Sequence, residues 1–180
     1  MPNKIPASVL VPGKNEEANL PACLKSLEPA NEIFVVDSQS SGRSVEIAES
    51  YGVKVVQFQF NASCPKKKNW SLENLPFSHQ WVLIVDCDER ITPEFWTEIL
   101  QAIQNPNYQG YYLNRRVFFL GTWIRHGGKY PDRNLRLFKH KLGRYENLKT
   151  EDITNTGDNE VHEHVVLSDK VGYLQNDMLH

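Results

Sequence analysis

Two carboxylates one residue apart offer the clearest chemistry in this 180-residue chain. Asp86 and Asp88 directly follow the apolar run at residues 81–85, which predicts a short buried strand. In open α/β sheets, ligands bind at the carboxyl ends of the strands, where this doublet would lie. Carboxylate oxygens suit Mg²⁺ or Mn²⁺, and such ions usually also hold substrate phosphates. The doublet therefore indicates a metal-dependent enzyme with a phosphorylated substrate. A pair of loop carboxylates, one of which caps the next helix, is the alternative.

Strand and helix patterns alternate on both sides of the doublet. Apolar runs predict strands at residues 7–11, 32–36, 53–58, 81–85 and 110–113. Helical periodicity and helix-start signals predict helices at residues 16–27, 45–50, 66–75 and 92–103. This alternation predicts an α/β fold with a mostly parallel sheet flanked by helices on both faces. From residue 115 to residue 180 the sequence is more aromatic and irregular, with further strands expected at residues 135–138 and 164–167.

Composition narrows the class of protein. The net charge of −2 provides no basic field for nucleic acid, so we expect no nucleic-acid partner. Three scattered cysteines form no disulfide framework and fit a reducing compartment. The first residues show no apolar signal region, and no apolar run reaches transmembrane length. We therefore expect a cytoplasmic protein, with peripheral membrane contact left open.

Polar groups follow three of the predicted strands: the turn at residues 12–16, Asp37, and the doublet. Their order and spacing resemble the nucleotide-sugar half of family 2 glycosyltransferases, which have the GT-A fold. The strings FLGTWIRHGG at residues 119–128 and LRLF at residues 135–138 are similar to one branch, the bacterial lipopolysaccharide-core β-glucosyltransferases. The resemblance covers nearly the whole chain. It implies one glycosyltransferase domain, with residues 1–114 as the nucleotide-sugar-binding half and residues 115–180 as the acceptor-side half.

The resemblance implies roles on the nucleoside side of the site. Asp37, the acid after the second strand, would contact the base. The turn containing Pro12, Gly13, Asn15 and Glu16 would lie along the nucleoside. Ordinary capping of the following helices is the alternative for Asp37, Asn15 and Glu16.

The resemblance also implies roles around the diphosphate. Asp88 would be the better ligand of Mn²⁺ or Mg²⁺, and Asp86 would contact the ribose or support the metal. Lys68, in a lysine segment typical of the family, would place positive charge near the nucleotide or the metal. A solvated helix start is the alternative for residues 66–68, and we favour it for Lys66.

Arg136 and Arg125 are candidates for contacts with the pyrophosphate or the acceptor. An ion pair with a loop acid such as Asp132 is an equally open alternative for both. Three positions depart from the family pattern and leave the donor sugar open: Gly42 near the place of a frequent Asp, Lys67 at a frequent Gln or Ala, and Lys129 at a common Trp.

Inverting transfer, which the resemblance implies, needs a carboxylate to accept the proton of the acceptor hydroxyl while the metal neutralises the leaving diphosphate. Glu163 stands in a Val-His-Glu string that matches the branch. Asp152 follows Glu151 in a string similar to the Thr-Glu-Asp of more distant relatives. We favour Glu163 and keep Asp152 as the alternative. His162 and His164 could bind zinc, but no third ligand has zinc spacing.

The expected function is metal-dependent inverting hexosyl transfer from a nucleotide-diphosphate sugar to a saccharide or lipid-linked acceptor in bacterial cell-envelope glycan synthesis. UDP is favoured as the nucleotide only because members of the resembled family commonly use it. A lipid-linked acceptor would place the enzyme at the inner face of the cytoplasmic membrane. A non-catalytic nucleotide-sugar-binding module and a nucleotidyltransferase are the alternatives. A dehalogenase-type phosphatase is disfavoured because Arg90 stands where its motif needs Thr or Val. Relatives usually continue past residue 180, so we expect a truncated or short form of unknown oligomeric state.

Overall fold

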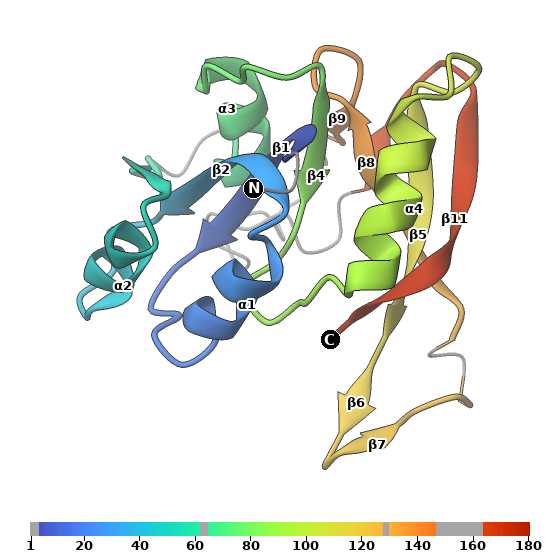
Figure 1. The fold of residues 1–180 in the computed structure, drawn as a ribbon. Coiled ribbons are helices and arrows are strands. Elements are labelled where there is room, and N and C mark those ends of the chain that lie inside the picture. Colours follow the sequence, from blue (N-terminus) through green and yellow to red (C-terminus); the bar gives the residue numbers. More distant parts are fainter. Residues whose placement is uncertain (1–3, 62–64, 128–129, 147–163) are drawn as a thin grey trace.

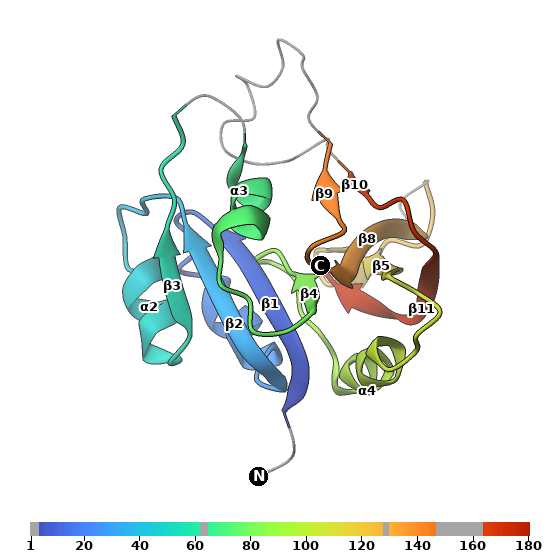
Figure 2. The ribbon, with the colours of Figure 1, turned by 90° about the horizontal axis from the view of Figure 1, so that it is seen from above.

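The computed structural model describes residues 4–61, 65–127, 130–146 and 164–180. A seven-stranded sheet has the strand order β11–β5–β8–β4–β1–β2–β3, which Figure 2 shows from right to left. The strands of the sheet are β1 (Ile5–Gly13), β2 (Ala30–Asp37), β3 (Lys54–Gln57), β4 (Trp81–Ile84), β5 (Gly110–Arg116), β8 (Asp132–Lys139) and β11 (Val171–Leu179). Only β8 runs antiparallel to its neighbours, β4 and β5. The predicted mostly parallel α/β sheet is confirmed.

Helices cover both faces of this sheet. They are α1 (Leu20–Ser26), α2 (Ser44–Ser50), α3 (Lys67–Asn74) and α4 (Pro93–Ile103). Alternate residues of β1 point to opposite faces, so Val9 and Val11 join the core formed with α1, α2 and α4. Leu10 joins the second core with Leu72 of α3. Figure 1 shows α4 alongside β5 and β11. Because β1 is buried on both faces from Ala7 to Pro12, Ser8 is the one polar side chain in that stretch.

Helix starts follow local chemistry. Thr92 caps α4 by accepting a hydrogen bond from the Phe95 backbone N–H (3.2 Å), and Pro93 is the first helical residue, as predicted. Helix α1 starts at Leu20 rather than at the predicted residue 16. Pro21 explains the difference, because a proline deeper inside a helix would clash with the carbonyl four residues earlier.

The second half of the chain joins the same sheet as the first. β8 lies between β4 and β5, and β11 extends the edge beyond β5. Two short antiparallel strand pairs complete this half: β6 (Phe118–Phe119) with β7 (Thr122–Trp123), and β9 (Arg144–Tyr145) with β10 (Val165–Val166). No helix among the described residues is long and apolar enough to cross a membrane.

A buried carboxylate near the start of β2 links the three neighbouring strands β1, β2 and β3. Glu32 of β2 accepts hydrogen bonds from Ser8 of β1, Lys54 of β3 (2.7 Å) and Ser78 (2.8 Å). Burial raises the pKa of this carboxyl, but the hydrogen bonds from Lys54, Ser8 and Ser78 outweigh burial and lower it to about 2. Glu32 is therefore ionised and stabilises the fold at neutral pH.

Candidate active site

A cavity of about 440 Å³ opens where β1 and β4 end. These strands are parallel neighbours, so their carboxyl ends bring the Gly13 turn and the doublet together. Residues from α3, β5, β8, β9 and β10, and His180 directly after β11, complete the wall. The described lining residues are Pro12, Gly13, Lys14, Glu16, Lys67, Lys68, Asp86, Cys87, Asp88, Arg115, Asn134, Leu135, Arg136, Tyr145, His164, Val165 and His180.

Asp86 lies between two buried cations. Its carboxylate is 3.1 Å from Lys68 Nζ and 2.9 Å from Arg136 Nη2. The side chains of Lys68 and Arg136 are only 8% and 9% exposed. Burial alone would raise the pKa of Asp86, but Arg136 and Lys68 hold it well below its usual range. Asp86 is thus ionised and fixes both cations at the cavity wall.

Glu89 supports this cluster from behind, and the sequence interpretation did not include it. Its fully buried carboxylate accepts a hydrogen bond from the Asp86 backbone N–H (2.7 Å). The other carboxylate oxygen is 3.7 Å from Arg136 and 3.6 Å from Arg115. Burial raises the pKa of Glu89. The sequence could have indicated Glu89, because it is an acid directly after the doublet, at the end of a predicted buried strand.

Asp88 has different surroundings. Its side chain is 52% exposed, and its carboxylate is 3.1 Å from His180 Nε2. This hydrogen bond lowers the pKa of Asp88 and raises that of His180. Paired backbone hydrogen bonds between Arg90 and Leu179 (2.8 and 3.0 Å) hold the end of β11 beside the doublet. Sequence reasoning missed His180 because only this long-range pairing brings it to Asp88.

The residues at Asp88 fit a divalent metal ion. A partly exposed carboxylate and an imidazole nitrogen offer oxygen and nitrogen donors, a set that suits Mn²⁺. The residues that the structure describes contain no cluster of three or more protein ligands. Substrate phosphates and water would supply the remaining ligands, as is usual for ions that bind with a phosphorylated substrate.

Positive charge dominates the cavity wall. Five lysine and arginine side chains line it against three carboxylates, those of Glu16, Asp86 and Asp88. Lys67 also donates a hydrogen bond to the Gly13 carbonyl (3.1 Å), which joins α3 to the turn after β1. Clustered cations in a partly desolvated cleft favour an anionic ligand.

Two of the predicted nucleoside residues, Asn15 and Asp37, are absent from the described lining of the cavity. The Asp37 carboxylate accepts hydrogen bonds from the Ser40 backbone N–H (2.9 Å) and hydroxyl. The Asn15 side chain accepts from the Ser41 backbone N–H (3.0 Å), and the Asn15 backbone N–H donates to the Ser40 hydroxyl (2.8 Å). Both side chains therefore shape the loop between β2 and α2. Neither caps a helix, because α1 and α2 begin without a side-chain cap, so the capping alternative is wrong for Asn15 and Asp37. Base contact by Asp37 stays a prediction.

Two expectations about basic residues need correction. The solvated helix start, which was the alternative for residues 66–68 and the favoured interpretation for Lys66, is wrong because all three lysines are buried. Arg136 pairs with Asp86 and not with Asp132, whose partner is Arg115 (2.7 Å). Arg125 is exposed and stacks on the Trp123 ring, 4.2 Å from its centroid.

The proposed bases lie outside the described residues, as does His162: neither Glu163 nor Asp152 is placed by the structure. His164, which follows Glu163 in the sequence, lines the cavity. The choice between the two carboxylates stays a prediction.

Similarity to known proteins agrees with this geometry. The family model described as "Glycosyl transferase family 2" matches residues 8–158. The lipopolysaccharide core biosynthesis glycosyltransferase LpsC of Rhizobium meliloti (strain 1021) is 31% identical over 150 residues, which cover 79% of this chain and 54% of LpsC. The chain spans about half the length of the curated relatives it matches.

Solved structures share the fold. S. aureus TarS 1-349 in complex with UDP-GlcNAc matches with a TM-score of 0.60 at 20% identity, covering 94% of this chain and 59% of that one. Glucosyl-3-phosphoglycerate synthase from Mycobacterium tuberculosis, in complex with Mn²⁺, UDP-glucose and phosphoglyceric acid, matches with a TM-score of 0.50 at 24% identity, covering 61% and 44%. The chain belongs to glycosyltransferase family 2 and has the GT-A fold.

Proposed function

We propose that this chain carries the donor site of a metal-dependent inverting glycosyltransferase. It would move a hexose from a UDP-sugar to a saccharide or lipid-linked acceptor in bacterial cell-envelope glycan synthesis, of which lipopolysaccharide core assembly is one form. The observation that carries this proposal is the doublet at the mouth of a cation-lined cavity. LpsC, named for lipopolysaccharide core biosynthesis, supports the acceptor class. A lipid-linked acceptor would place the enzyme at the inner face of the cytoplasmic membrane.

Each wall of the cavity has a task in this proposal. Lys68 and Arg136, held by Asp86, would attract and orient the diphosphate. Asp88 and His180 would hold Mn²⁺ or Mg²⁺, which when bound neutralises charge on the leaving diphosphate. Pro12, Gly13 and Glu16 line the same cavity and would lie along the nucleoside. Asn15 and Asp37 would complete the nucleoside side.

The reaction would be a single displacement at the anomeric carbon. The acceptor oxygen forms a bond to this carbon as the bond from the carbon to the diphosphate oxygen breaks, which inverts the configuration. Glu163 would accept the proton of the acceptor hydroxyl, with Asp152 as the alternative base. The transition state carries oxocarbenium character, as in glycoside hydrolysis.

Metal-dependent UDP binding tests the proposal. UDP at one hundred times its Kd should stabilise the protein by about 2.7 kcal/mol when Mn²⁺ is present. Asp88→Ala should abolish this gain and leave the fold intact, whereas Asp169→Ala, at an exposed carboxylate outside the cavity lining, should keep it. Thermal unfolding with and without UDP and Mn²⁺ measures both. Unchanged Mn²⁺-dependent UDP binding by a folded Asp88→Ala protein would contradict the metal assignment.

Hydrolysis of UDP-sugars with and without Mn²⁺ separates an enzyme from a non-catalytic binding module. An enzyme should release free sugar slowly in the presence of the metal, since water can replace the acceptor. Binding of UDP-sugar with neither hydrolysis nor transfer would favour the module.

A further inference from the structure

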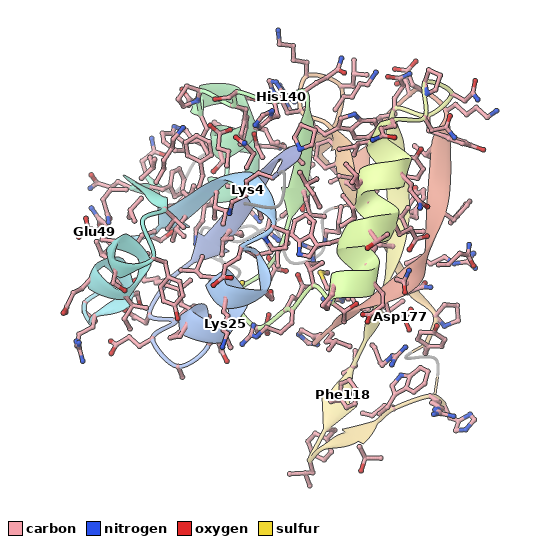
Figure 3. All side chains as sticks on the ribbon, viewed as in Figure 1. Lys4, Lys25, Glu49, Phe118, His140 and Asp177 are labelled. Carbon is pink, nitrogen blue, oxygen red and sulfur yellow. The ribbon has the colours of Figure 1, made fainter. Side chains whose placement is uncertain are left out.

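A short hairpin carries apolar side chains into solvent. β6 and β7 pair at Phe118 with Trp123 and at Phe119 with Thr122, and residues 120–121 form the turn. Phe119 is 65% exposed and Leu120 is 90% exposed. Figure 1 shows this hairpin projecting away from the sheet, and Figure 3 shows Phe118 on it, apart from the rest of the molecule. Three consecutive large apolar residues, Phe118 to Leu120, therefore form an exposed tip.

The backbone of the tip is also unfavourable for leucine. Leu120 has φ 49° and Gly121 has φ 75°, so both central residues of the turn are left-handed. Hairpin turns of this kind favour Asn, Asp or Gly, and a side chain with φ above zero costs free energy. Solvent and backbone would both favour a polar residue at position 120. A leucine at such a position points to a role for its apolar side chain.

Positive charge and an aromatic ring lie directly behind the tip. Residues 110–127 contain three arginines and no aspartate or glutamate, in a chain with a net charge of −2. The Trp123 ring contacts the guanidinium groups of Arg116 and Arg125, 4.3 and 4.2 Å from its centroid. Arg115 pairs with Asp132 and Arg116 with Asp177, each at 2.7 Å. Arg125 is exposed, and no carboxylate of the described residues pairs with it. At a bilayer surface, an apolar tip would lie among the acyl chains, and the tryptophan and arginine behind it would lie at the level of the phosphate headgroups.

The hairpin is joined to the cavity. Arg115, at the end of β5, lines the cavity three residues before the hairpin begins. The Phe118 backbone N–H donates a hydrogen bond to the His180 carbonyl (2.8 Å), and the His180 ring contacts Asp88. A surface that holds the hairpin would therefore also hold the cavity mouth close to it.

We propose that the β6–β7 hairpin inserts its tip, Phe118 to Leu120, into the surface of a bilayer containing anionic phospholipid. The apolar side chains enter the acyl boundary, while Trp123 and Arg125 remain at the headgroups. This inference goes beyond the proposed function, because insertion needs neither the donor nor the reaction. A second copy of the chain is the competing occupant of the tip.

Sedimentation with vesicles of phosphatidylethanolamine and phosphatidylglycerol tests the proposal. The wild type should sediment with these vesicles, and less with phosphatidylcholine alone. Leu120→Asn should lower the partition coefficient about tenfold, because one leucine side chain no longer leaves water. Its thermal midpoint should stay equal or rise, because Asn adopts the left-handed conformation more readily. Leu142→Asn is the matched control: Leu142 is 43% exposed, beyond the end of β8 opposite the hairpin, and its change should leave partitioning unaltered.

Each result decides for or against the hairpin. A wild type that stays in the supernatant, or a Leu120→Asn protein that partitions like the wild type, overturns the proposal. Analytical ultracentrifugation covers the competing occupant: a wild-type dimer that Leu120→Asn dissociates, without vesicle binding, assigns the tip to a second copy. UDP binding in solution separates the two proposals. A wild type that binds UDP but does not bind vesicles counts against the hairpin alone, and a wild type that binds vesicles but not UDP counts against the donor site alone.

Discussion

Asp86→Asn should destabilise this protein far more than its partial exposure suggests. The amide keeps the shape of the side chain but removes the negative charge that lies 3.1 Å from Lys68 Nζ and 2.9 Å from Arg136 Nη2. Both cations are more than nine-tenths buried, so water cannot replace the carboxylate. Among the described residues, the carboxylate that Arg136 would keep is that of Glu89, at 3.7 Å.

The size of the loss follows from the burial of the partners. Removing one member of a buried ion pair costs about 3–5 kcal/mol. Asp86 itself is 28% exposed and Glu89 still faces Arg136, so we expect the lower end, about 3 kcal/mol. For a chain of this length, that loss lowers the thermal midpoint by roughly 6–12 °C.

Asp132→Asn is the matched control. Asp132 pairs with Arg115 at 2.7 Å, but the two side chains are 31% and 25% exposed. Partly exposed pairs contribute little, so this change should cost no more than about 1 kcal/mol. Urea unfolding of the wild type and both variants measures the difference in the free energy of unfolding, provided that its dependence on urea concentration is the same for all three.

Inorganic pyrophosphate links this stability to the proposed site. If Lys68 and Arg136 face a diphosphate position, pyrophosphate without metal should stabilise Asp86→Asn more than it stabilises the wild type, because the anion replaces the missing charge. Equal losses for Asp86→Asn and Asp132→Asn would refute the reasoning about burial. Equal stabilisation of wild type and Asp86→Asn by pyrophosphate would refute the reasoning about the anion.

Three further predictions concern the nucleoside, the base and pH. Asp37→Ala should weaken binding of UDP and uridine alike in calorimetry, and a loss confined to UDP would point to a phosphate-side role. Glu163→Gln should lower the transfer rate about 10²–10⁴-fold and keep donor binding, whereas Asp152→Asn should matter far less; the opposite pattern in rate assays would make Asp152 the base. Glu32, with its pKa lowered from 4.5 to about 2, should contribute about 3 kcal/mol above pH 4.5 and lose it as pH falls toward 2. Urea unfolding across this range should show a shallower loss for Glu32→Gln, and an unchanged slope would contradict the assignment.

The first five sheet strands could be predicted because each contains a short apolar run between turn or helix signals. The clearest are β4, which is buried along its whole length, and the largely buried β1. β11 could not be found this way. Its exposed face and its polar residues Gln175, Asn176 and Asp177 interrupt the apolar pattern. The position of β8 between β4 and β5 was also out of reach, because strand order depends on pairing between distant segments.

The same distinction applies to the site. Gly13, Asp86 and Asp88 could be predicted because strand ends in parallel sheets meet at one edge. His180 reaches Asp88 only through the pairing of β11 with residue 90. The burial of Lys67 and Lys68 could not be predicted, because the local sequence of a short helix does not show which distant strands pack over it.

The two carboxylates of the doublet have separate tasks because their surroundings differ. A carboxylate that binds a metal ion must reach the ligand and must not already be neutralised by fixed cations. Asp88 meets both conditions, since it is half-exposed and its neighbour is a histidine that can itself ligate. Asp86 lines the cavity but fails the second condition, since Lys68 and Arg136 already share its charge. We infer that Asp88 serves the metal directly and that Asp86 acts mainly through the two cations. Losing Asp88 should remove the Mn²⁺ dependence of UDP binding, whereas losing Asp86 should alter stability and anion affinity.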